Sequence, residues 1–322
     1  MNSVHKVSQN MRLFKPAFRP RQRSIKLYEM FMRDGLQSLQ VCYPLETKIK
    51  FANLLSGCNF DYIELGSTTN PKKIPQMQDS EKLFSQVNLN PLTDYGMLVP
   101  SYSHTHKVLE QGIKSFGLVC SISETFARKN LKKTSDQSVE EVLKQMDLIL
   151  QHKSNISVCP HIRVYLSGAF GSPWEPFDPP YLLNLIFTMR KFVGVANQYN
   201  LEPDNFDLVI SDTFGLSDYT RTYTILNLIR EYFYSETNEY FAMHIHSKDD
   251  NWKKLIENCF NNSICKFDCS MGGIGGCPYA EDHALGNIST VQLVKYLQNN
   301  GFGKNYDLDL LTETESTIKS YM

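Results

Sequence analysis

The chain has 322 residues, of which 42% are apolar, and a formal net charge of -1, so it can bury a large core as one domain or two small ones. No basic stripe interleaves with aromatic residues, which excludes the usual signature of a nucleic-acid-binding protein and favours a small-molecule partner. No apolar run is long enough to cross a bilayer and no secretory signal is present, so we expect a soluble intracellular protein without a membrane partner.

Residues 1–25 form a predicted basic extension. Seven Lys and Arg residues precede the first acidic residue, Glu29. This bias fits either an organelle transit segment or a solvated, disordered tail, so the compartment stays open between cytoplasm and mitochondrial matrix. The eight cysteines are scattered through a chain too large to need disulfides, and we expect reduced thiols.

From Lys26 onward, short apolar runs alternate with amphipathic helical patterns, which is typical of repeated βα units and a parallel sheet. The predicted strands are Lys26–Phe31, Tyr62–Gly66, Gly96–Val99, Phe116–Ser121, Ile162–Ser167, Leu208–Asp212, Phe241–His246 and Phe267–Met271. Eight such units favour a TIM (β/α)8 barrel over residues 26–300, followed by a short helical cap over 301–322. The alternative is a doubly wound open sheet, but no G-x-G-x-x-G follows the first strand.

Polar residues with catalytic chemistry fall at the ends of these predicted strands, where barrel enzymes keep their active sites. They are Arg33, Asp34, Glu64, Asp212, His244 and His246, and a glycine-rich segment that carries Cys277 follows the last strand. We expect all of them to face one mouth of the barrel.

His244 and His246 are two residues apart in a predicted strand, so both side chains point to the same face. Asp34 and Asn287 can add oxygen ligands, and such a mixed set with open positions suits Mg²⁺ or Mn²⁺. The H-x-H spacing alone is weak evidence for a metal site and is more typical of two core or surface histidines. His104-Thr105-His106 has the same spacing at the start of a helical pattern, and we interpret it as a solvated face.

Each of the other candidates, Arg33, Glu64 and Cys277, has a structural interpretation as well as a catalytic one. Arg33 can stabilise an enolate oxygen or form a salt bridge at a strand end. Glu64 would be costly to bury unpaired, and its expected pairing with Arg33 can be structural or catalytic. Cys277 can act as a general acid or base, or it can be a buried, inert thiol.

Several motifs of the chain together resemble the 3-hydroxy-3-methylglutaryl-CoA lyase family of the DRE-TIM metallolyase superfamily. They are Arg33-Asp34-Gly35-Leu36-Gln37, Pro71-Lys72-Lys73-Ile74-Pro75-Gln76-Met77, Asp212-Thr213, Met243-His244-Ile245-His246, Gly275-Gly276-Cys277-Pro278-Tyr279-Ala280 and Gly286-Asn287. The resemblance covers nearly the whole chain from Glu29. The cysteine-bearing segment is its most specific part, because sister synthases share the arginine, aspartate and paired histidines without it.

The resemblance implies a metal-dependent retro-Claisen cleavage of HMG-CoA to acetoacetate and acetyl-CoA, a step of leucine degradation and ketone-body formation. It implies metal ligands at Asp34, His244, His246 and Asn287, and catalytic roles for Arg33, Glu64 and Cys277. It implies substrate contacts at Arg33, Gln37, Tyr165, Asp212 and Thr213. The expected cofactor is Mg²⁺ or Mn²⁺ and the expected partner is an acyl-CoA, while a homodimer is left open.

The chain departs from the family pattern at several places, including a final helix that is expected to be short. Gln40 replaces a lysine, Ser247-Lys248-Asp249 follows the paired histidines, and the segment from Cys277 to Asn287 is one residue longer. These departures leave two alternatives open: a related metal-dependent aldolase or acyl-CoA condensing enzyme, and a catalytically silent homologue that acts as a binding protein.

Overall fold

The computed structural model describes residues 25–152, 159–233, 238–247, 250–276, 285–302 and 306–322. Eight parallel strands close into a barrel in chain order, and the last strand pairs with the first. The strands are β1 (Lys26–Glu29), β2 (Tyr62–Ser67), β3 (Asp94–Leu98), β4 (Ser115–Ser121), β5 (His161–Ser167), β6 (Phe206–Ser211), β7 (Phe241–His244) and β8 (Lys266–Cys269). The predicted TIM barrel is confirmed, and residues 1–24 of the predicted extension lie outside the described residues.

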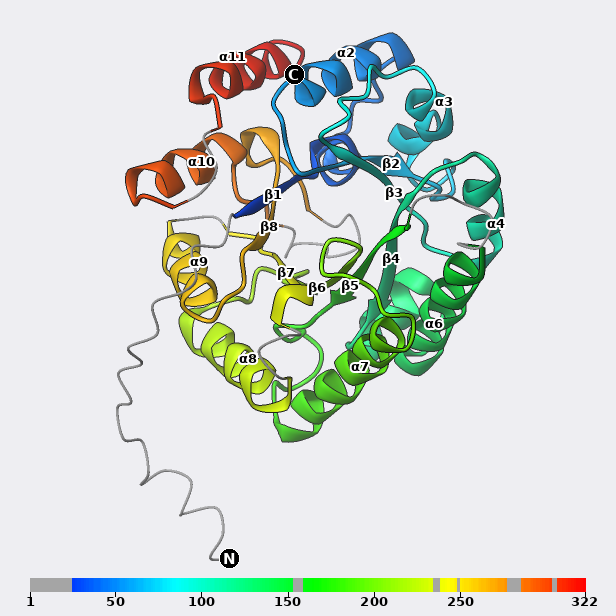
Figure 1. Ribbon diagram of the computed structural model, residues 1–322, viewed down its shortest axis with the longest axis vertical. Helices are drawn as coiled ribbons and strands as arrows, with labels where there is room; N and C mark the ends of the chain where they lie inside the picture. The colour runs from blue at the N-terminus through cyan, green and yellow to red at the C-terminus, as the bar shows by residue number, and fades with distance from the viewer. Residues whose placement is uncertain (1–24, 153–158, 234–237, 248–249, 277–284, 303–305) are drawn as a thin grey trace, which may run out of the picture.

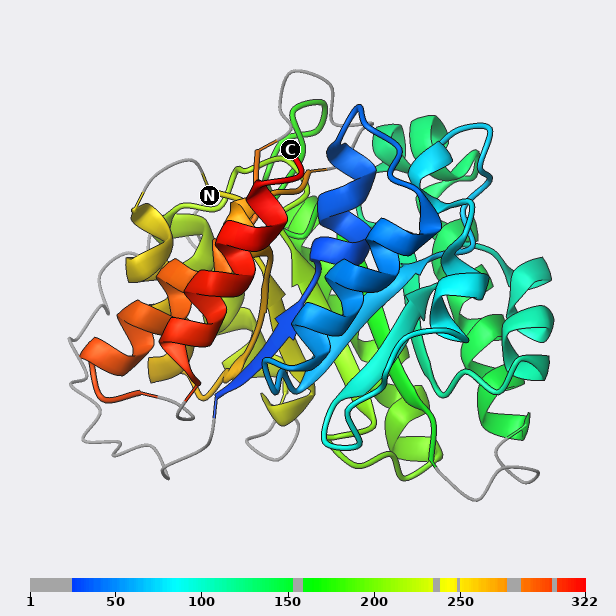
Figure 2. The same cartoon turned by 90° about the horizontal axis from the view of Figure 1, so that it is seen from above.

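Helices surround the strands on all sides (Figure 1), and the side view shows α11 lying beside α10 and α2 (Figure 2). The helices are α1 (Leu36–Ser38), α2 (Leu45–Ser56), α3 (Ser80–Phe84), α4 (Tyr102–Glu110), α5 (Glu124–Phe126), α6 (Ser135–His152), α7 (Pro179–Gln198), α8 (Tyr219–Tyr232), α9 (Asn251–Asn261), α10 (Thr290–Asn299) and α11 (Leu308–Lys319). In the described part of the chain, none of them combines the length and apolar character that a membrane crossing needs.

Side-chain caps determine where several helices begin. The carboxylate of Asp178 accepts a hydrogen bond from the amide of Tyr181 at the start of α7, and the first two positions of that helix are prolines. The hydroxyl of Ser289 accepts from the amide of Gln292 at the start of α10. Such caps satisfy amides that have no partner inside the helix.

Alternation along β5 separates the core outside the barrel from the barrel interior. Ile162, Val164 and Leu166 are buried in the large apolar cluster between strands and helices. Tyr165 instead belongs to a small cluster inside the barrel, and the fully buried Arg163 lies on the same face of the strand. The polar residues of β5 therefore face the barrel interior, and its apolar residues pack between the strands and the helices.

The first strand is shorter than predicted, because the chain turns at Met30. The carbonyl of Met30 accepts hydrogen bonds from the amides of Arg33, Asp34 and Gly35, which form a single π-helical turn over Phe31–Gly35. The predicted strand Lys26–Phe31 ends at Glu29 instead. This turn places Arg33 and Asp34 beyond the end of β1.

The seventh strand also ends early, at His244 rather than His246. His246 pairs instead in an isolated antiparallel bridge with Asn287, a residue that follows β8. Ile245, between the two histidines, is buried in the core, so the alternation of side chains continues past the end of the strand.

Candidate active site

A buried charge cluster formed by Arg33, Asp34 and Glu64 lies at the mouth of the barrel. The Nε of Arg33 donates to a carboxylate oxygen of Glu64, and its Nη1 donates to Asp34 Oδ1 at 2.5 Å. Both carboxylates and the guanidinium are almost completely buried. Burial alone lowers the pKa of Arg33, but Glu64 and Asp34 raise it well above its ordinary value, so the guanidinium stays charged.

Glycine at position 117 of β4 provides the space for Glu64. A Cβ atom built there lies 2.5 Å from Glu64 Oε1, which is closer than real Cβ contacts allow. The same carboxylate oxygen accepts from the hydroxyls of Tyr165 at 3.2 Å and Tyr62 at 3.4 Å. Glu64 is therefore held on both oxygens, and the pairing with Arg33 that the sequence predicts is present.

Asp34, His244 and His246 together could hold a metal ion. One ligand atom from each lies within 4.8 Å of the other two, and all three residues are buried. The Nε2 atoms of the two histidines are 2.9 Å apart, and His246 Nε2 is 3.9 Å from Asp34 Oδ2. Two imidazole nitrogens and one carboxylate oxygen thus converge on a common point.

Asn287 completes this group from the other end of the chain. Its Nδ2 donates to Asp34 Oδ2 at 2.7 Å and to the carbonyl of Ile274 at 3.2 Å. Its Oδ1 is buried without a hydrogen-bond partner among the described residues. Because a buried oxygen without a partner is costly, this acceptor fits a cation in the cluster.

The protonation states of the cluster also suit a cation. Burial, together with the neighbouring His244, lowers the pKa of His246 to about 3, so its ring is neutral at physiological pH. Although burial raises the pKa of Asp34, Arg33 and the two histidines lower it well below its usual range. A carboxylate and neutral imidazoles are the forms that bind divalent ions, and oxygen-containing sets suit Mg²⁺ or Mn²⁺.

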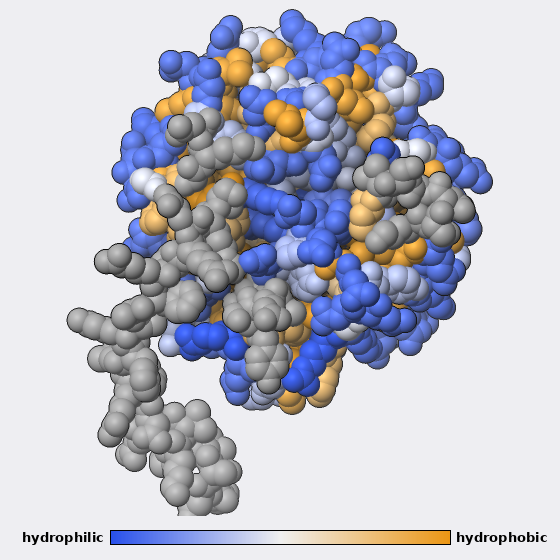
Figure 3. All heavy atoms as spheres, in the orientation of Figure 1, coloured by the Kyte–Doolittle hydropathy of each residue, from blue (hydrophilic) through white to orange (hydrophobic). Residues whose placement is uncertain are grey.

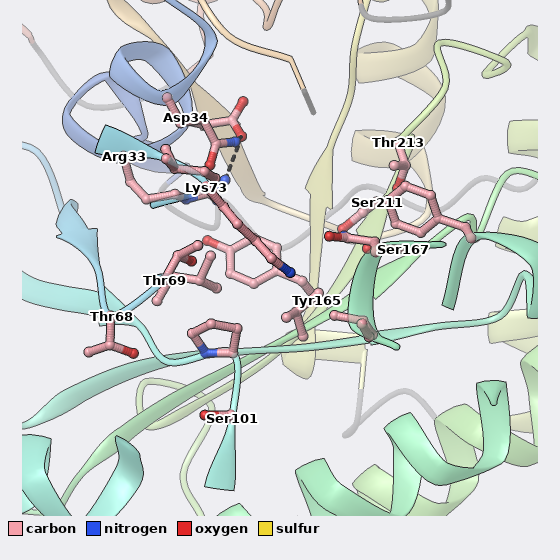
Figure 4. A pocket seen from close by; sticks show the side chains of 18 of the residues that line it. Arg33, Asp34, Thr68, Thr69, Lys73, Ser101, Tyr165, Ser167, Ser211 and Thr213 are labelled. Carbon is pink, nitrogen blue, oxygen red and sulfur yellow. Dashed lines mark hydrogen bonds and ion pairs between the residues drawn. The ribbon is translucent and has the colours of Figure 1, made fainter. Parts of the chain in front are cut away.

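A cavity of about 290 Å³ opens beside the cluster, where hydrophilic side chains gather at the centre of the face in Figure 3. Hydroxyl groups at the ends of β2, β3, β5 and β6, or just after them, line it, and Figure 4 shows their side chains. They belong to Thr68, Thr69, Ser101, Ser167, Ser211 and Thr213. Such a lining can hydrogen-bond a polar small molecule.

Three predicted substrate contacts, Gln37, Tyr165 and Thr213, line this cavity together with Arg33. The side chain of Gln37 donates to Asp34 Oδ1 at 2.7 Å, so it also orients the cluster. The hydroxyl of Thr213 accepts from the amide of Gly168 at 3.0 Å. The structure therefore brings these residues to one site.

Asp212 has a different environment, although Thr213 follows it directly. Its two carboxylate oxygens accept from the amides of Leu216 at 2.7 Å and Ser217 at 3.0 Å, and it is not among the described lining residues. Burial raises the pKa of Asp212 to about 6. In this structure its carboxylate shapes the turn after β6.

Cys277, the predicted thiol, lies outside the described residues.

Three basic residues that line the cavity, Lys73, His104 and Lys133, were not assigned to the site from the motifs. Lys73 extends over the cavity (Figure 4), and no ion pair is found for its ammonium group within the described ranges. His104, predicted to lie on a solvated face, is half-buried and lines the cavity, whereas His106 is exposed as expected. Lys73 lies inside the motif Pro71–Met77, so its place in that motif could have indicated a role in the site.

Among the charged residues deep in the barrel, Arg163 and Asp268 were also missed. Arg163 and Asp268 are buried on strands whose flanking residues are apolar. The argument that singled out Glu64, a charge on an otherwise apolar strand, applies equally to both of them.

The chain is similar to known lyases over almost its full length. A family model described as HMGL-like matches residues 24–318. The hydroxymethylglutaryl-CoA lyase of Bacillus subtilis is 30% identical over 304 residues, which cover 94% of this chain and 95% of that relative. The 3-hydroxy-3-isohexenylglutaryl-CoA/hydroxy-methylglutaryl-CoA lyase of Pseudomonas aeruginosa is 26% identical and covers 92% of both chains.

A solved structure agrees with these sequence matches. The crystal structure of the Bacillus subtilis HMG-CoA lyase superposes with a TM-score of 0.79 at 29% identity, and the match covers 92% of this chain and 93% of that chain. The resemblance expected from the motifs is thus confirmed. Together with the barrel and the cluster at its mouth, these matches show that the chain belongs to the HMGL-like family and is a carbon–carbon lyase.

Proposed function

We propose that this lyase cleaves 3-hydroxy-3-methylglutaryl-CoA to acetoacetate and acetyl-CoA, with Mg²⁺ or Mn²⁺ as its cofactor. The observation that carries the proposal is the convergence of Asp34, His244 and His246 beside the buried pair of Arg33 and Glu64. Once a base has taken the proton of the tertiary hydroxyl, breaking the bond between the α- and β-carbons of the acyl-CoA leaves a ketone on one product and an enolate on the other. This site offers Arg33 and the proposed cation for the negative charge of the enolate.

Asp34, His244, His246 and Asn287 would hold the cation. When bound, a divalent cation supplies Lewis-acid stabilisation of a substrate oxygen. His244 donates Nδ1–H to Asp268 at 3.0 Å, which leaves its Nε2 lone pair directed at the cluster.

Arg33 is the second cationic group and would stabilise the enolate oxygen. Its guanidinium is fixed by two carboxylates before substrate arrives, so no reorganisation is needed when charge develops. Glu64 orients Arg33 through the pair described above. Cys277 would deliver the proton that converts the enolate of acetyl-CoA to product.

The polar cavity supports an acyl-CoA substrate that carries its own negative groups. Lys73 offers an ammonium group at the mouth, whereas Lys133, another lining residue, already pairs with Glu141. Lys73 can therefore bind an anionic group of the substrate. This chain has Gln40 at the position where the family has a lysine.

The proposal is tested with protein stripped of metal, by measuring acetoacetate released from HMG-CoA. Turnover should appear on addition of Mg²⁺ or Mn²⁺ and disappear in excess EDTA. His246→Ala should lose turnover, and His106→Ala should keep it, because His106 is an exposed histidine of the same H-x-H spacing outside the cluster. Full turnover in excess EDTA, or no turnover of HMG-CoA with either ion, overturns the proposal.

A further inference from the structure

The barrel interior directly beneath the site is charged, where barrels of this kind usually contain branched aliphatic side chains. Arg163 on β5 lies at the centre of this region. Its guanidinium is completely buried between two aspartates, Asp207 on β6 and Asp268 on β8. All three residues point into the barrel, and their partners determine what the region does.

The guanidinium of Arg163 is fixed in position and orientation. Its Nε donates to Asp207 at 2.9 Å and its Nη2 to Asp268 at 2.6 Å. The aromatic rings of Tyr28 and Tyr62 enclose it at 4.3 and 4.8 Å from ring centre to guanidinium carbon. A planar fork held in this way can set the direction of each group that it binds.

One connection runs from Arg163 to the metal cluster. Asp268 accepts from Arg163 on Oδ1 and from His244 Nδ1 on Oδ2, the latter at 3.0 Å. Because a carboxylate only accepts, this hydrogen bond fixes the proton of His244 on Nδ1 and the orientation of its ring. Arg163 thereby directs Nε2 of His244 at the proposed cation.

A second connection runs from Arg163 to the enolate side of the site. Its Nη1 donates to the hydroxyl of Tyr165 at 3.0 Å, and that hydroxyl is 3.2 Å from Glu64 Oε1. Since the Tyr165 oxygen accepts from Arg163, its own proton is free to point at Glu64. Glu64 in turn holds Arg33. The two connections leave Arg163 in different directions and share no other residue.

We propose that Arg163 is a positioning residue which, through Asp268 and Tyr165, orients both the metal-binding half and the enolate-binding half of the active site. The chemistry it serves rests on the proposed function, but its effect on cation binding does not. Neither half includes Arg163 among the groups that would contact substrate, because Arg163 is absent from the lining of the described cavity.

Stability alone does not account for this arrangement. Removing charges from water is expensive, and well-packed apolar residues of similar volume are often as stable or more stable than a buried ion pair. Asp207 also has partners besides Arg163: the ammonium group of Lys266 at 2.6 Å and the imidazole of His161 at 2.9 Å. Lys266 thus compensates the charge of Asp207, while Arg163 is the only Lys or Arg side chain among the described ion pairs of Asp268.

Four variants separate positioning from stability, with Mn²⁺ affinity measured without substrate by titration calorimetry. Asp268→Asn replaces one of the two accepting oxygens with an NH₂ group, which then faces an N–H donor of Arg163 or His244. This variant should weaken Mn²⁺ binding about 10- to 100-fold, the usual effect of losing a partner of a metal-binding histidine. Tyr165→Phe should keep Mn²⁺ affinity within about twofold and lower kcat on HMG-CoA. Arg163→Lys should show both effects, because one ammonium group cannot replace the fork.

Lys266→Met is the matched structural control. It removes a buried cation from the same network, but Lys266 reaches neither Asp268 nor Tyr165 among its hydrogen bonds. We expect a lower melting temperature with Mn²⁺ affinity and kcat within about twofold of wild type.

Different results overturn the two proposals. If folded Arg163→Lys binds Mn²⁺ and turns over like wild type, or if Lys266→Met weakens Mn²⁺ binding as strongly as Asp268→Asn, Arg163 is structural only. If Arg163→Lys does not fold, wild-type Mn²⁺ affinity in Asp268→Asn rejects the positioning role by itself. Wild-type protein that binds Mn²⁺ but leaves HMG-CoA intact would instead refute the proposed function.

Discussion

At the residue scale, Arg33 has both a structural and a catalytic interpretation. Its buried contacts with Asp34 and Glu64 bridge the turn after β1 and strand β2, as a structural pair would. The same contacts present a fixed cation to the cavity. Kinetics and stability measured on one variant distinguish the two interpretations.

Arg33→Gln should lower kcat on HMG-CoA by a hundredfold or more and raise KM much less. An interaction made mainly in the transition state has this signature, and the loss of one such donor costs on the order of 10²–10³ in rate. We would measure kcat, KM and melting temperature on the same preparation. A destabilised protein with normal turnover would show that the pair only joins two elements.

Glu29, at the end of β1, makes a pH-dependent contribution to stability. Its carboxylate accepts from the amides of Phe31 at 2.9 Å and Met271 at 3.0 Å, and from the hydroxyl of Thr290. Burial nevertheless raises the pKa of Glu29 to about 7, from 4.5. The folded protein therefore holds this proton over a pH range in which the unfolded chain has lost it.

Because the folded pKa is raised, the contribution of Glu29 is fully present below about pH 4.5 and is lost as pH rises to about 7. The slope within this window reaches at most about 1.4 kcal/mol per pH unit. We expect Glu29→Gln, a neutral isostere, to remove this slope, as measured by urea unfolding of both proteins from pH 4.5 to 8. A constant difference between the two proteins across that range would contradict the buried, protonated carboxyl.

The segment after β8 passes very close to the candidate metal site of Asp34, His244 and His246. A Cβ atom at Gly275 would lie 2.6 Å from Asp34 Oδ2 and would also collide with the side-chain amide of Asn287. The φ angle of Gly275 is +155°, a value that side chains rarely adopt. Glycine here allows two proposed ligands to meet.

Gly275→Ala should therefore weaken Mn²⁺ binding and lower turnover while the barrel still folds. Gly112→Ala is the matched control, because Gly112 also has a positive φ, +73°, but open space within 4 Å. Both variants should lose stability through backbone strain, roughly 1 kcal/mol for Gly112. Equal Mn²⁺ affinities in the two variants would mean that the close approach has no role in the site.

Elements with a repeating pattern were predictable from the sequence, and elements built on single contacts were not. Apolar alternation located all eight strands to within a few residues. The turn at 31–35 depends on three amides that share the carbonyl of Met30, and the pairing of His246 with Asn287 depends on the path of a distant segment. Neither contact has a periodic signature, so the first and seventh strands were predicted too long.

The site was predictable where the motifs name its residues, and less so where packing selects them. Motifs identified the cluster of Asp34, His244 and His246, but Arg163 and Asp268 carry no motif. The role of Asp212 in the turn after β6 could not be predicted either, because its hydrogen-bond partners are backbone amides, which every residue type has. The sequence shows which residue types are present, whereas the closure of the barrel determines which of them meet.

At the scale of the whole molecule, a cation that binds only the folded chain should stabilise it. Free Mn²⁺ at a hundred times its dissociation constant should raise the free energy of unfolding by about 2.7 kcal/mol. The melting temperature of wild type should rise with Mn²⁺ concentration, and that of His246→Ala should not. His106→Ala, altered at an exposed histidine of α4, should respond like wild type. An equal response in His246→Ala would place the stabilising ion elsewhere.

The pairing of β1 with β8 joins the two ends of the barrel, and the cluster lies across this junction. Asp34 follows β1, and its hydrogen-bond partner Asn287 lies 253 positions later in the chain. During synthesis Asp34 leaves the ribosome long before its partner exists. The proposed ion site therefore needs both ends of the barrel, so uptake of Mn²⁺ during refolding should report the pairing of β1 with β8.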